Sequence, residues 1–124
     1  MTVNIEVLNI KEVQDFLKGK NKDVIKAAEQ AIAQASLWVE GEVKASVAGE
    51  KAEPQSVDTG RFLNSIASSS QGLVGEVSSD VEYGKYLEYG TFKLPERRHF
   101  RNTIDRSKDK VNEFILEKIK QATS

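Results

Sequence analysis

The spacing of apolar residues constrains the fold of this chain more than any other feature. From about residue 21 to residue 47, apolar side chains recur every three or four positions, the period of one helix face. They are Ile25, Ala28, Ile32, Ala35, Val39 and Val43, with Trp38 at the edge of the stripe. A second stripe, from about residue 97 to residue 122 and interrupted at Ser107-Lys108, consists of Phe100, Ile104, Val111, Ile115, Ile119 and Ala122. We expect two long helices, the first of which could approach a sheet closely through its alanines.

Between these stripes the period changes to two. The segments Leu63–Ser70 and Leu73–Ser79 flank Gln71-Gly72 and predict a hairpin closed by a glycine-bearing turn. The alternation of Val3, Ile5 and Val7 with polar residues predicts a short N-terminal strand. The predicted fold class is α+β: a small antiparallel sheet, made of the N-terminal strand and the hairpin, packed by two long helices.

Shorter elements follow from local signals. Apolar residues at helical spacing predict a helix over 11–17, and Asn21 is placed to cap the first long helix. A short helix is expected over Glu82–Tyr89, with Gly90 closing it in a left-handed conformation. The segment Ala48–Val57 lacks periodicity, and we expect an exposed, flexible loop there.

Length and composition predict one domain over residues 1–124. The chain is 39% hydrophobic and 30% charged, which is typical of globular proteins. Its apolar runs are far shorter than the roughly 20 residues that cross a bilayer, and its first ten residues lack the pattern of a signal peptide. We therefore expect no membrane partner and a location in the cytoplasm of the cell that makes the protein.

The sequence offers little for catalysis or metal binding. It has no cysteine, and its one histidine, His99, stands near Arg97, Arg98 and Arg101. Neighbouring cations oppose the imidazolium that a general base must form, so we expect a surface or interface histidine. Glu40 and Glu42 differ by two positions on a helix and would point different ways. We expect no enzyme activity, no cofactor and no metal.

Charge is distributed unevenly along the chain. The net charge is −1, but residues 93–110 hold seven Lys/Arg against three Asp/Glu, a net of +4. A basic segment of this kind favours an alternative function, a small DNA-binding module using residues 93–110. A solvated helix face with its adjoining loop is the simpler interpretation.

Three segments between the long stripes form an ordered set of motifs: Asp58–Ile66, Val81–Thr91 and Pro95–Phe100. They resemble the D-T-G-R-L-x-x-S-I, Y-A-x-Y-x-E-F/Y-G-T and R-P-F-L/I signatures of the tail completion, or head-tail joining, proteins of long-tailed phages. The resemblance extends from about residue 57 to residue 104. The residues that match the first two signatures are Asp58, Thr59, Gly60, Arg61, Ser65, Ile66, Tyr83, Tyr86, Glu88, Gly90 and Thr91.

The chain departs from these signatures at three places. Phe62 replaces the usual Leu, and Gly84 stands where the family usually has Ala. The segment Arg98-His99-Phe100 lacks the Pro of the third signature. Something other than that proline must therefore set the start of the last helix.

The resemblance implies a structural virion protein that caps the head-proximal end of the tail tube and joins it to the head connector. Six copies in a ring would match the symmetry of the tail. Its partners would be other copies of itself, the tail tube protein and the head connector or stopper protein, with DNA only passing through the channel and no small-molecule substrate. The implied location is the head-tail interface of the virion, with the host cytoplasm during assembly.

The motif residues also have physical roles that can be expected in advance. Asp58 can accept from the N–H groups after it and fix a turn, and the resemblance implies that this turn orients Arg61 toward a neighbouring subunit. Three tyrosines in one short helix favour partial exposure, because each buried hydroxyl needs a partner. Glu88 could pair with Arg61, Arg97 or Arg98. The interface predicted by the motifs comprises Asp58, Thr59, Gly60, Arg61, Ser65, Tyr83, Tyr86, Glu88, Tyr89, Gly90, Thr91, Arg97, Arg98 and Phe100.

Overall fold

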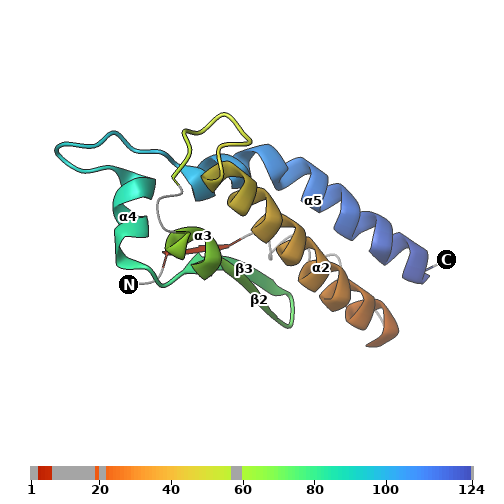
Figure 1. The fold of residues 1–124 in the computed structure, drawn as a ribbon. Helices are drawn as coiled ribbons and strands as arrows, with labels where there is room; N and C mark the ends of the chain where they lie inside the picture. Colours follow the sequence, from red (N-terminus) through yellow and green to blue (C-terminus); the bar gives the residue numbers. More distant parts are fainter. Residues whose placement is uncertain (1–2, 7–18, 20–21, 57–59, 124) are drawn as a thin grey trace.

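The computed structural model describes residues 3–6, 19, 22–56 and 60–123, and it has the predicted α+β architecture (Figure 1). The described elements are β1 (Val3–Glu6), α2 (Lys22–Val47), α3 (Arg61–Ser65), β2 (Ala67–Gln71), β3 (Val74–Ser79), α4 (Glu82–Tyr89) and α5 (His99–Thr123). The predicted helix over 11–17, the Asn21 cap and the turn at Asp58 and Thr59 lie outside the described residues. No helix in the described part of the chain is long and apolar enough to cross a membrane.

The sheet has three antiparallel strands in the order β1-β3-β2. Ile5 is paired with Val77, and Gln71 is paired with Val74 across the hairpin. The N-terminal strand and the hairpin are therefore confirmed. The turn is Gly72-Leu73, one position later than predicted, and Gly72 has the positive φ of 58° that this turn requires.

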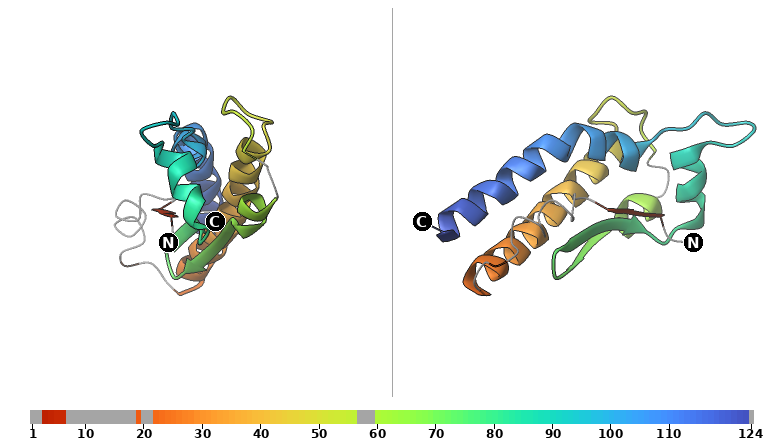
Figure 2. Two further views of the ribbon diagram at one scale, coloured as in Figure 1. Left: turned by 60° about the vertical axis from the view of Figure 1, so that its left-hand side comes forward. Right: turned by 180° about the vertical axis from the view of Figure 1, so that it is seen from behind.

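The two long helices lie side by side in all the views (Figures 1 and 2), and α2 also contacts both strands of the hairpin. The predicted stripe of α2 is buried from Ala28 to Val43, whereas Ile25 is half-buried. Ala31, beside the stripe, is buried as well. A Cβ atom at Gly75 of β3 would lie 2.1 Å from Ser36 Oγ of α2. The helix thus approaches the strand so closely that position 75 has no room for a side chain.

The segment after Gly60 differs from the prediction. A strand was expected from Leu63, but residues 61–65 form the helix α3 and the strand begins at Ala67. Gly60 has a positive φ of 80°, and the Asn64 N–H donates to the Gly60 carbonyl at 2.9 Å. This closed turn satisfies backbone groups locally and delays the entry into the sheet.

The last helix also differs in detail. It begins at His99 instead of Arg97, because Arg98 has a positive φ of 57°. Ala122 is exposed and Ile104 is half-buried, so neither belongs to the core. The polar residues His99, Thr103 and Ser107 are buried in its first turns, which means that the stripe is not interrupted at Ser107.

Candidate interface site

The first two motifs meet on one surface, formed by the start of α3 and the outer face of α4. Arg61 from the first motif and Tyr83 and Tyr86 from the second line a shallow hollow of about 280 Å³, together with Val81 and Glu82. We call these five residues the α3–α4 surface. Tyr83 and Tyr86 are 36% and 46% exposed, which confirms the predicted partial exposure. Partly exposed tyrosine beside arginine is the composition that anchors protein interfaces.

Phe62 and Gly84 hold the two halves of this surface together. Phe62 is buried below α4, and its ring centroid lies 6.0 Å from that of Tyr83. A Cβ atom at Gly84 would lie 2.5 Å from Phe62 Cε1. The larger side chain at position 62 thus occupies the space that an alanine at position 84 would need. The two departures from the family signatures therefore lie against each other.

Ser65 has a structural role beneath this surface. Its Oγ donates to the Phe62 carbonyl at 2.6 Å and lies 2.6 Å from Ser79 Oγ. Ser79 Oγ in turn accepts from the Val81 N–H at 3.2 Å. Ser65 thereby connects α3 to the end of β3 and to the residue before α4.

The side chain of Glu88 caps the start of α5, where the third motif lacks its usual proline. Its buried carboxylate, 1% exposed, accepts from the backbone N–H groups of Phe100 at 2.8 Å and Arg101 at 3.0 Å. Its salt-bridge partner is Arg101, with Nε at 2.9 Å, so the expected pairing with Arg61, Arg97 or Arg98 is wrong. A carboxylate at a helix N-terminus satisfies free N–H groups and interacts favourably with the helix dipole.

The other second-motif residues shape the path from α4 to α5. Gly90 has a positive φ of 78° but a ψ of 172°, so it is not left-handed helical as predicted. That region of backbone conformation is open essentially to glycine alone. Thr91 Oγ1 accepts from the N–H groups of Lys93 and Leu94 at 3.2 and 3.1 Å and closes the next turn. Tyr89 is 52% exposed and packs on Arg101, whose guanidinium carbon lies 4.5 Å from the ring centroid.

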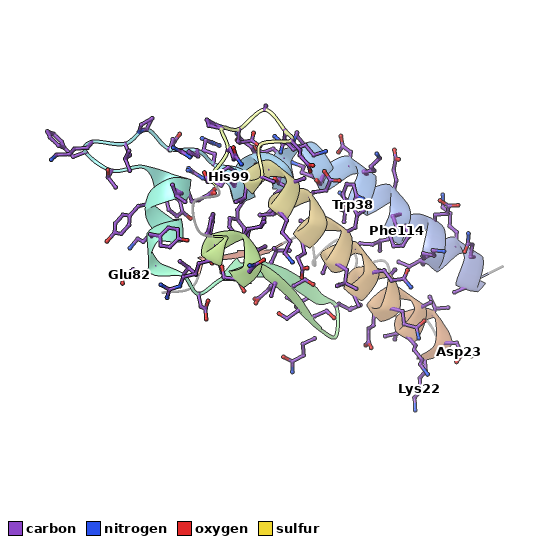
Figure 3. The ribbon with its side chains drawn as sticks, viewed as in Figure 1. Lys22, Asp23, Trp38, Glu82, His99 and Phe114 are labelled. Carbon is purple, nitrogen blue, oxygen red and sulfur yellow. The ribbon has the colours of Figure 1, made fainter. Side chains whose placement is uncertain are left out.

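His99 is fully buried, which corrects the prediction of a surface or interface histidine. Ser46 Oγ lies 2.7 Å from Nδ1 of His99, and Ser56 Oγ lies 2.7 Å from Nε2. Figure 3 shows His99 where the first turn of α5 meets the rest of the molecule. The helix geometry explains the burial, because His99, Thr103 and Ser107 precede Val111 at four-residue steps.

The hydrogen bonds around His99 fix its protonation. Ser46 Oγ donates to Glu53 Oε1 at 2.6 Å, so it must accept from Nδ1–H of His99. Ser56 Oγ accepts from Arg97 Nη1 at 2.8 Å and can donate to Nε2. Burial lowers the pKa of His99, and this lowering prevails over the nearby Glu88 and Glu53, which raise it. The imidazole is therefore neutral, and because His99 and Ser46 are buried, a substrate has no direct access to the pair.

Glu53 fastens the loop that follows α2. The loop was expected to be exposed throughout, but Glu53 is buried and accepts from both Arg106 Nη1 and Nη2, at 2.7 and 2.8 Å. Asn102 Nδ2 donates to the same carboxylate at 3.1 Å. The hydrogen bonds from Arg106 lower the pKa of Glu53 to about 2, so it is a carboxylate at neutral pH. Arg97 Nη1 also donates to the Gln55 carbonyl at 2.6 Å.

Arginines of the basic segment 93–110 form salt bridges with carboxylates of the same chain. Arg101 pairs with Glu88 and Glu96, and Arg106 pairs with Glu53. An arginine held by a carboxylate contributes less to displacing phosphate counterions. The arrangement thus gives the DNA-binding alternative little support. Among the described residues there is also no group of three or more His, Cys, Asp or Glu that could hold a metal ion.

The motif residues thus divide by position. Arg61, Tyr83 and Tyr86 gather on the α3–α4 surface, whereas Ser65, Glu88 and Phe100 serve the interior. Sequence reasoning missed Arg101, Arg106, Glu53, Ser46 and Ser56. The four-residue step from His99 to Val111 was a usable signal for the burial of His99. Nothing local in the sequence links Glu53 to Arg106.

The comparison with known families agrees with the motif assignment. A family model described as "Bacteriophage HK97-gp10, putative tail-component" matches residues 10–90, which is more than half of the chain and includes α3 and α4. Neither a curated protein nor a solved structure was found to match. The chain belongs to the HK97-gp10-like family of bacteriophage tail components.

Proposed function

We infer that this tail component completes the head-proximal end of the tail tube and joins the tail to the head connector. The observation that carries the proposal is the α3–α4 surface, where Arg61 from one motif and Tyr83 and Tyr86 from another meet in a protein of a phage tail family. The protein acts there through binding, not through catalysis. Its location in the virion is the interface between head and tail.

A ring of six copies is the assembly that fits this position, because the tail has six-fold symmetry. Each copy would contact its two neighbours through two different surfaces, and this head-to-tail contact must close into a ring to avoid an open filament. The partners are neighbouring copies, the tail tube protein and the connector or stopper protein of the head. A chain of net charge −1 suits a ring through which DNA passes without being held.

The direct test is a phage that lacks this protein. Its lysate should contain DNA-filled heads and separate, finished tails when viewed by electron microscopy of negatively stained particles. Empty heads would place the protein in packaging, and absent tails would place it in tube assembly. Either result would contradict the proposed role.

A further inference from the structure

The loop between α4 and α5 lies at the end of the molecule opposite the C-terminus (Figure 1). Phe92, in the Thr91–Leu94 turn of this loop, is a fully exposed aromatic residue. Two backbone hydrogen bonds close this turn. The Thr91 N–H donates to the Leu94 carbonyl at 2.8 Å, and the Leu94 N–H donates to the Thr91 carbonyl at 3.3 Å. A ring held on a preformed turn loses little conformational entropy when it binds a partner.

The two long helices form an open groove that could receive such a ring. Trp38, Phe114 and Ala35 are among its six lining residues, and its volume is about 340 Å³. Figure 3 shows Trp38 and Phe114 between α2 and α5. We call this site the α2–α5 groove, lined by Gln34, Ala35, Trp38, Lys110, Val111 and Phe114. A closed apolar cavity of about 150 Å³ already holds benzene, so the groove is large enough for a phenyl ring.

Charged residues lie beside both features. Lys93, next to Phe92, is exposed. On α5, Glu113 and Glu117 are exposed, and each lies three residues from a groove residue, which places them on its outer rim. Lys110 also lines the groove, with its Nζ 5.8 Å from the Trp38 ring centroid, and Lys118 Nζ lies 5.6 Å from the Phe114 ring centroid. A copy that brings its Phe92 ring to the groove would therefore bring its lysine to a rim that carries both carboxylates and lysines.

We propose that Phe92 of one copy inserts into the α2–α5 groove of the next copy and so forms the repeating contact of the ring. The inference rests on the proposed function, which requires copies to contact one another. The Phe92 side chain and the α2–α5 groove lie on different surfaces of each copy. The contact is therefore head-to-tail, as a cyclic assembly needs. Because Phe92 is fully exposed, it does not occupy the groove of its own chain.

The absence of native cysteine makes cross-linking a clean test. A Lys93→Cys protein, which keeps Phe92, is mixed with a Gln34→Cys protein and treated with a short bis-maleimide reagent. Lys93→Cys mixed with Gln71→Cys, an exposed position on the hairpin, is the control. We expect a mixed dimer with the groove cysteine and little with the hairpin cysteine. Equal yields, or none with the groove cysteine, would overturn the contact.

The single tryptophan of the chain supplies an independent readout, because it lies in the groove. Acrylamide quenching of Trp38 should decrease as wild-type copies associate. Phe92→Ala should keep its circular dichroism, raise the concentration needed for association by about tenfold or more, and leave Trp38 quenchable. Leu116→Ala, which removes an exposed apolar residue outside the groove, should behave as wild type.

The possible results separate this contact from the proposed function. If Phe92→Ala associates and shields Trp38 as wild type does, the contact is wrong. If it associates normally but fails to join heads to tails, the loop binds another virion protein, and the contact is also wrong. Wild-type protein that cross-links as expected but never restores joining would support the contact and overturn the proposed function.

Discussion

At the scale of single residues, the pair Phe62 and Gly84 shows how two unusual choices can depend on each other. The Phe62 ring fills the space where a Cβ of residue 84 would lie, and both residues sit beneath the α3–α4 surface. Each choice alone departs from the family signatures. Together they fit, because residue 84 has no side chain where the Phe62 ring lies.

We predict that Gly84→Ala lowers the free energy of unfolding by about 1–3 kcal/mol, because the added methyl overpacks a buried ring. Adding Phe62→Leu should recover part of this loss, with a coupling of about 0.5–3 kcal/mol in a double-mutant cycle. Urea denaturation of the four proteins measures it. Purely additive effects would show that the two positions do not compensate each other.

The burial of His99 makes stability depend on pH. The folded pKa of His99 is lowered below the ordinary value of 6.5, so the unfolded chain binds more protons below that pH. The neutral His99 imidazole makes its full contribution to the free energy of unfolding above pH 6.5. This contribution decreases as the pH falls from 6.5 toward the folded pKa. The protein should therefore be less stable at pH 5.5 than at pH 7.5.

His99→Gln should remove this pH dependence between pH 7.5 and 5.5, as measured by urea denaturation at both values. Glu53 keeps its charge in that range, because its folded pKa is about 2 and its ordinary value is 4.5. Protonation of the Glu53 carboxylate therefore lowers stability only at lower pH, and it does so in both the wild type and His99→Gln. A wild-type protein that gains stability at pH 5.5 would contradict the neutral assignment.

At the scale of elements, the carboxylate of Glu88 decides where α5 begins. It accepts from two backbone N–H groups and from Arg101, and all three contacts are lost together in Glu88→Ala. We predict a loss of about 2–3 kcal/mol in the free energy of unfolding, because buried donors are left without partners. Thermal denaturation followed by circular dichroism checks this.

Glu96→Ala is the matched control for that prediction, because Glu96 pairs with the same Arg101, at 3.2 Å, but is exposed. An exposed pair contributes little, so this variant should melt close to wild type. If the two variants lose the same stability, the effect comes from the arginine pairing and not from the start of the helix.

The elements were predictable where a periodic pattern extends over many residues. The stripe of α2 and the alternation of β3 identified their elements, whereas α3 was missed because a five-residue helix gives no period. The pairing of Glu53 with Arg106 was not predictable, since 53 residues separate them and neither stands in a motif. The same holds for Ser46 and Ser56 around His99.

At the scale of the whole molecule, the same motif segments contain both residues that hold the fold and residues that can bind a partner. Residues that hold the fold, such as Glu88 and Ser65, are buried or half-buried. Residues that can bind a partner, such as Arg61 and Tyr86, are exposed. Motif membership alone did not separate these groups, because both appear in the same short segments. Burial separated them.

The restoration of infectivity tests the central claim most directly. Purified protein is added to a lysate of the phage that lacks it, and plaque-forming particles are counted. Wild type and Lys85→Ala, an exposed α4 variant outside the surface, should restore the titre. Arg61→Glu and Tyr86→Ala should keep wild-type circular dichroism but restore few particles. Full restoration by both variants would contradict the claim that the α3–α4 surface joins tail to head.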